Sequence, residues 1–121
     1  MTGSRVGDSP NRVGGIDRVT GAQRYLADLP VADVLHAKLV TLDCARARIL
    51  GIDASEALAL PGVHLVMTAD DLPTPMPRYG PQYQDRPILA VGETEYHGEP
   101  VALVVAGTRD LGEGAARLVR V

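Results

Sequence analysis

Alternation of two kinds of residue is clear in two neighbouring stretches of the first half of the chain. A period of two residues is typical of a β-strand that lays one face on a core. Residues 34–41 show it, and residues 45–52 show it more sharply. In the first stretch one set is Leu35, Ala37 and Leu39, and the other is Val34, His36, Lys38 and Val40. In the second, Ala45, Ala47 and Ile49 alternate with Arg46 and Arg48. We predict two strands, joined near residues 42–44.

Two further strands are predicted in the second half of the chain. Residues 63–67 are a short, mainly apolar segment. Residues 101–106 are an uninterrupted run of six apolar residues, which is typical of a central strand that is buried on both faces.

Helix signals separate these strands. Asp53 and Glu56 have the spacing of a capping box and predict a short helix over residues 54–59, which Pro61 and Gly62 would end. Thr68 is placed to cap a brief turn through residues 70 and 71. Another threonine, at position 108, would cap a helix over residues 109–118, whose apolar face is Leu111, Ala115 and Leu118.

The remaining segments lack both patterns. Five prolines between Pro73 and Pro87 remove backbone donors, so we expect a long surface loop through which no strand ladder passes. Residues 1–17 are rich in Gly, Ser, Asn and Arg and predict a flexible tail. The domain would then span residues 18–121. Its last strand looks cut short at Val121.

Length, composition and charge limit the classes of protein to which this chain can belong. A chain of 121 residues fits one domain, and without Trp or Phe its core must be aliphatic. A net charge of −3 provides no positive field for nucleic acid. No apolar run approaches the roughly 20 residues of a membrane helix, and the start has no secretory signal. We therefore expect a cytoplasmic protein that binds neither nucleic acid nor membranes.

The polar residues do not form a recognisable catalytic pattern. His36, His64 and His97 lack metal-ligand spacing, and Cys44, the single cysteine, has no base beside it in the sequence. The adjacent Asp70 and Asp71 fit capping better than acid catalysis.

Three other groups of residues have equally plain interpretations. Glu93, Glu95 and Glu99 lie in what reads as an exposed hairpin. The glycines at 14, 15, 112 and 114 match no nucleotide-binding motif. Arg46 and Arg48 form a stripe that favours a solvated face over an ion-pairing surface for a partner domain. We predict no catalytic, cofactor-binding or metal-binding residue in this chain.

Short segments spread along the chain nevertheless resemble one family over residues 12–121. The segments are residues 19–21, 25–30, 45–49, 52–53, 60–63, 68–73 and 97–106. In this order they resemble the N-terminal hammerhead domain of the molybdenum hydroxylases, which include xanthine dehydrogenase, aldehyde oxidase and the large subunit of aerobic carbon monoxide dehydrogenase. The chain departs from the family at residues 42–44, where many relatives carry a Ser-Pro-His-like segment, and at Glu99, where relatives often have Gln.

The resemblance implies an α+β domain with a mixed or antiparallel sheet packed by two short helices. It also implies an oxidoreductase whose molybdopterin cofactor, iron–sulfur clusters and FAD are bound by later domains or by partner subunits. On this interpretation the chain is an inactive structural domain that packs on the remaining large subunit and on iron–sulfur and flavin partners. Exposed apolar surface would favour self-association of the isolated chain. The alternative is a free-standing binding or assembly module with the same fold.

Overall fold

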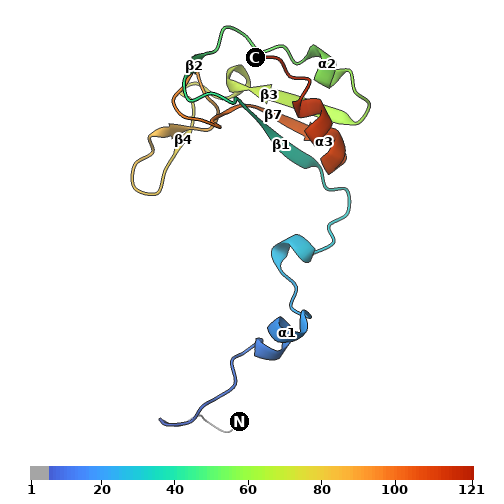
Figure 1. Ribbon diagram of the computed structural model, residues 1–121, viewed down its shortest axis with the longest axis vertical. Coiled ribbons are helices and arrows are strands. Elements are labelled where there is room, and N and C mark those ends of the chain that lie inside the picture. Colours follow the sequence, from blue (N-terminus) through green and yellow to red (C-terminus); the bar gives the residue numbers. More distant parts are fainter. Residues whose placement is uncertain (1–5) are drawn as a thin grey trace. The chain divides into compact units, whose positions relative to one another are not determined.

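The computed structural model describes residues 6–121, and the chain divides into two compact units between Asp33 and Val34 (Figure 1). The first unit contains the helix α1 (Gly15–Thr20) and the 3-10 helix η1 (Leu26–Asp28). None of its described residues is buried, and Ile16 and Val19 are largely exposed. The division into a flexible tail over residues 1–17 and a domain from residue 18 stays a prediction, and residues 1–5 of that tail lie outside the described residues.

The second unit is built on a three-stranded antiparallel sheet. Its strands are β1 (His36–Thr41), β3 (Val63–Thr68) and β7 (Pro100–Ala106), in the order β1-β7-β3. Figure 1 shows the three strands side by side with the helices α2 (Ser55–Leu58) and α3 (Arg109–Ala116) close to them. The predicted central strand and the α+β class are confirmed.

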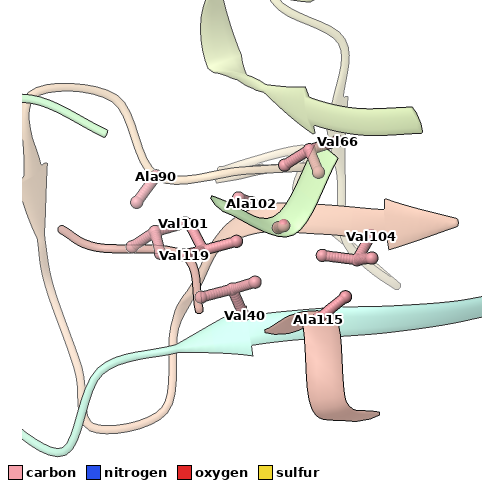
Figure 2. Close-up of a cluster of buried hydrophobic side chains, with 9 residues drawn as sticks. Val40, Val66, Ala90, Val101, Ala102, Val104, Ala115 and Val119 are labelled. Atoms are coloured by element: carbon pink, nitrogen blue, oxygen red, sulfur yellow. The ribbon is translucent and has the colours of Figure 1, made fainter. Parts of the chain in front are cut away.

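Both helices cover the same face of this sheet. α3 contacts β1 and β7, whereas α2 contacts β3 and α3. The face beneath them carries the buried residues of the three strands, and Ala57 and Ala115 meet it from the helices. These strand residues are Val40, Val66, Ala102, Val104 and Ala106. Figure 2 shows that Val101 and Val119 join the same cluster. The core is therefore aliphatic, as the composition predicted.

The opposite face of the sheet has no such cover. Leu103 on the central strand β7 has two cross-strand neighbours on this face. They are Leu39 on β1 and Met67 on β3. Leu39 is 49% exposed, and Leu103 and Met67 are only partly buried. The prediction that residues 101–106 are buried on both faces is therefore wrong for this chain. On each strand, the side chains that alternate with the buried core residues point away from both helices.

The predicted strand over residues 45–52 is mostly absent. Only β2 (Ala47–Arg48) is a strand, and it pairs with β6 (Glu93–Thr94) in a separate two-stranded sheet. β2 does not pair with β1, the strand before it in the chain, because β1 pairs with β7. The alternation itself is visible in the exposure: Ala47 and Ile49 are half-buried, and Arg46 and Arg48 are exposed.

The proline-rich segment also differs from the expectation. β4 (Arg78–Tyr79) and β5 (Arg86–Pro87) form a short antiparallel ladder within it. In Figure 1 the chain around β4 extends away from the three-stranded sheet. The prediction that no ladder occurs here is wrong, because a proline at the end of a two-residue strand leaves the pairing of its neighbour intact.

Two of the three predicted caps are present. The Thr108 hydroxyl accepts a hydrogen bond from the backbone N–H of Leu111. The backbone N–H of Thr68 donates to Asp71 Oδ2 at 2.7 Å, which closes the 3-10 helix η2 (Ala69–Asp71). The capping box predicted at residues 53–56 is wrong. There the carboxylate of Asp53 accepts from the backbone N–H of Ser55 at 2.9 Å.

Candidate functional site

Two polar side chains are buried beside the two-stranded sheet of β2 and β6. They lie in the segment that was predicted to be an exposed hairpin. Thr94 is fully buried and Glu99 is 3% exposed, so the prediction is wrong for Glu99, whereas Glu93 and Glu95 are exposed as predicted. The Thr94 hydroxyl accepts a hydrogen bond from the backbone N–H of Ala47 at 3.0 Å. The Glu99 carboxylate accepts one from the backbone N–H of Glu95, while the Glu99 N–H donates to the carbonyl of Tyr96. These bonds hold the turn between β6 and β7.

Charged and phenolic groups near this turn influence Tyr96. Desolvation is the largest cause that raises the pKa of the Tyr96 hydroxyl, and the charges of Tyr79 and Glu99 raise it further. Arg86 has the opposite effect. A tyrosine whose neutral form is favoured serves as a hydrogen-bonding group at neutral pH. The raised pKa therefore keeps the Tyr96 hydroxyl protonated at neutral pH.

Arg46 of the arginine stripe forms an ion pair within the chain, and other charged residues of the second unit do the same. Arg46 Nη2 lies 2.9 Å from Glu93 Oε1, and this hydrogen bond is the largest cause that raises the pKa of Arg46. Arg120 pairs with Glu56 across the domain. Lys38 and Arg109 both approach Glu113 on α3. All of these pairs are exposed, so each contributes little to stability.

The three histidines do not converge on one site. His36 lies opposite Ala106 at one end of β7, and His64 lies on β3 near the same end. His97 lies in the turn before the other end of β7, and its Nε2 is 2.7 Å from Asp43 Oδ1. In residues 6–121, no group of three His, Cys, Asp or Glu side chains is arranged to hold a metal ion.

The remaining candidates also have structural surroundings. Cys44 is half-buried in the bend between β1 and β2. Asp70 and Asp71 are both exposed, and the Asp71 carboxylate closes η2. Gly112 is buried in α3 close to β1, and Gly114 faces open space. Asp43, the residue before Cys44, pairs with His97.

Hollows on the surface of the second unit are shallow and have mixed linings. One of about 350 Å³ lies between β1 and the end of α3, and one of about 290 Å³ lies between residues 49–52 and residues 90–92. Every buried side-chain N or O atom of the described residues already has a hydrogen-bond partner.

One extended feature of the second unit was missed from the sequence. We call it the open sheet face, and it consists of Ala37, Leu39, Leu65, Met67, Leu103 and Val105. These residues share one face because they are cross-strand neighbours in a single register. The signal was present in the sequence, since residues 35, 37 and 39 are apolar alongside a strand that is apolar at every position. The three-stranded sheet is apolar on both faces. The single layer of helices covers one face and leaves the open sheet face uncovered.

None of the helices described here combines the length and the apolar character needed to cross a lipid bilayer.

Comparison with known proteins gives one consistent family. Residues 20–121 match the model of the aldehyde oxidase and xanthine dehydrogenase a/b hammerhead domain. The nicotine 6-hydroxylase large subunit of Paenarthrobacter nicotinovorans is 42% identical over 84% of this chain and 13% of its own length. The xanthine dehydrogenase of Drosophila pseudoobscura pseudoobscura is 39% identical over 88% of this chain and 8% of its own length.

Solved structures agree with these sequence matches. Quinoline 2-oxidoreductase from Pseudomonas putida 86 superposes with a TM-score of 0.83 and is 37% identical, over 94% of this chain and 15% of that chain. A carbon monoxide dehydrogenase from Oligotropha carboxidovorans superposes with a TM-score of 0.82 and is 34% identical, over 94% of this chain and 14% of that chain. The chain thus spans no more than about a sixth of the length of any of these proteins.

Proposed function

Because this chain belongs to the aldehyde oxidase and xanthine dehydrogenase a/b hammerhead domain family, we propose that it is the N-terminal structural domain of the molybdopterin-binding large subunit of a molybdenum hydroxylase. One observation carries the proposal. The match covers residues 20–121 of this chain but only 8–15% of the similar proteins. A module that is so small a part of its relatives supplies one piece of a larger enzyme.

The enzyme so formed would insert oxygen derived from water into a carbon–hydrogen bond of a purine, an aldehyde or a similar substrate. Its electrons would leave through iron–sulfur and flavin centres. The molybdopterin would be held by later domains of the large subunit, and the iron–sulfur clusters and FAD by partner domains or subunits. The residues of this chain would contribute a rigid aliphatic scaffold and no catalytic group.

The partners and the compartment follow from the same proposal. The domain would contact the remaining large subunit and, through it, the iron–sulfur and flavin components. The net charge of −3 argues against binding to nucleic acid. We place the enzyme in the cytoplasm and expect no membrane partner.

The test is to purify, from its own host, the polypeptide that carries these residues and to measure its mass and its pterin content. We expect a polypeptide several times longer than 121 residues that co-purifies with molybdopterin, whereas the 121-residue chain expressed alone retains none. A stop codon directly after Val121 and a native product of 12.8 kDa would contradict the proposal. That result would establish the alternative, a free-standing binding or assembly module. Tight pterin binding by the 121-residue chain alone would contradict its scaffold role.

A further inference from the structure

We propose that the open sheet face is the surface by which this domain packs on the rest of the large-subunit polypeptide. This inference rests on the proposed function, since it names the partner of the scaffold. The face consists of the six residues defined above, Ala37, Leu39, Leu65, Met67, Leu103 and Val105, and none of them is polar or charged.

Exposure separates this face from the helix-covered face of the same strands. Leu39 is 49% and Leu65 is 41% exposed, whereas Val104, on the other face of the central strand, is fully buried. An antiparallel sheet with one solvated face normally alternates apolar with polar residues. Here the alternation is lost on β7, where Leu103 and Val105 are as apolar as the core residues beside them. The sequence of β7 is that of a strand covered on both sides.

The occupant can be inferred from the size of the face. Three strands about 4.8 Å apart and about four residues long, at about 3.3 Å each, give a patch of about 200 Å². A stable complex of two free proteins buries about 800 Å² on each partner. The patch by itself is well below that size, so a stable dimer of free chains would need further surface around it. A covalently joined domain needs less surface, because the connecting chain keeps it at an effective concentration of the order of millimolar.

Polypeptide for such an occupant exists in the relatives. The stretch that matches this chain is 13% of the nicotine 6-hydroxylase large subunit and 15% of the quinoline 2-oxidoreductase chain. Most of each large subunit therefore lies outside the matching stretch and can supply an apolar surface that faces the sheet. We infer that a later segment of the same polypeptide covers Leu39, Leu65 and Leu103.

The experiment places a photo-reactive benzoylphenylalanine at Leu39 or at Leu65 of the full large subunit, produced in its own host. These two positions lie on opposite edge strands, so one remains informative if the other impairs folding. Leu58 is the matched control, because it is also a leucine, is 51% exposed, and lies on α2 in the helical layer. After irradiation, mass spectrometry identifies the cross-linked peptides.

We expect positions 39 and 65 to cross-link to segments of the same polypeptide beyond residue 121, with at least a tenfold higher yield than position 58. Cross-links to a second copy, to another subunit or to residues 6–33 would overturn the inference, and so would an equal yield from position 58. These outcomes leave the proposed function intact when the polypeptide has the mass of a large subunit. A native product of only 12.8 kDa overturns both.

Discussion

The buried hydroxyl of Thr94 on β6 accepts a hydrogen bond of 3.0 Å from the backbone N–H of Ala47 on β2. Both strands are only two residues long. So short a ladder has few main-chain bonds, and this side-chain bond extends it. The substitution Thr94→Val keeps the shape and removes the acceptor. We expect it to lower the free energy of unfolding by about 1–3 kcal/mol, because a part-buried N–H loses its partner.

Amide hydrogen exchange at Ala47 measures this effect directly. The amide should exchange faster in Thr94→Val and remain protected in the control Thr94→Ser, which keeps the hydroxyl. Equal protection of the Ala47 amide in both variants would show that the hydroxyl does not hold β2.

The two faces of the three-stranded sheet should respond differently to truncation of Val104 on β7 and of Leu65 on β3. Val104→Ala removes two buried carbons and leaves a cavity under α3, so we expect a loss of about 2–3 kcal/mol in the free energy of unfolding. Leu65→Ala truncates a side chain that is 41% exposed and should cost about 1 kcal/mol or less in the 121-residue chain. Urea denaturation of the two variants measures both values. A cost for Leu65→Ala as large as that for Val104→Ala would mean that the open sheet face is covered within this chain.

Two glycines in α3 offer a gain in stability. A Cβ at Gly112 would lie 3.8 Å from the Cβ atoms of Ala106 and Lys38, and one at Gly114 would have no neighbour within 4 Å. Both substitutions by Ala should raise the free energy of unfolding by about 0.5–1 kcal/mol each, because Gly costs that much in a helix. Thermal denaturation measures the change.

Gly62 is the contrasting control. Its φ is +89°, and an added Cβ would lie 2.9 Å from Leu111 Cδ2. Gly62→Ala should therefore destabilise the domain. A stabilising effect there would contradict the left-handed turn before β3.

Stability at acidic pH should depend on Asp53. Hydrogen bonds from the side chain and backbone of Ser55 lower the pKa of the Asp53 carboxyl. A carboxyl whose pKa is lower in the folded state stabilises the fold fully above its unfolded pKa of about 3.9, and this contribution is lost as the pH falls through the folded pKa. The melting temperature of the wild type should therefore fall more steeply below about pH 4 than that of Asp53→Asn. Parallel curves for the two proteins would argue against the Ser55 bonds.

Glu99 should tolerate replacement by its amide. Gln keeps an oxygen that can accept the N–H of Glu95, so Glu99→Gln should retain the wild-type stability within about 1 kcal/mol. Glu99→Ala removes the acceptor and should cost about 1–3 kcal/mol. Chemical denaturation of the pair distinguishes these outcomes, and an equal loss in both variants would mean that the negative charge itself is required.

Much of the second unit was predictable because its signals are local. The central strand, the threonine caps of α3 and η2 and the aliphatic core all follow from residues that are near one another in the chain. The prediction of a strand over residues 45–52 was mostly wrong, because alternation indicates which side chains face a core and does not indicate which backbones pair. Its partner, β6, lies more than 40 residues away. The burial of Thr94 and Glu99 was missed for the same reason, since it depends on how the turn before β7 packs.

By itself the sequence determined the family, the threonine caps of η2 and α3 and the apolar character of every residue in β7, because these depend on residue identity and on short-range spacing. Only the tertiary structure decided which half of the apolar surface became the core. Val104 is buried because α3 folds back over that side of the sheet, and Leu103 remains accessible because the described residues supply one layer of helices. Each strand has two faces, and the number of layers that cover them is a property of long-range packing.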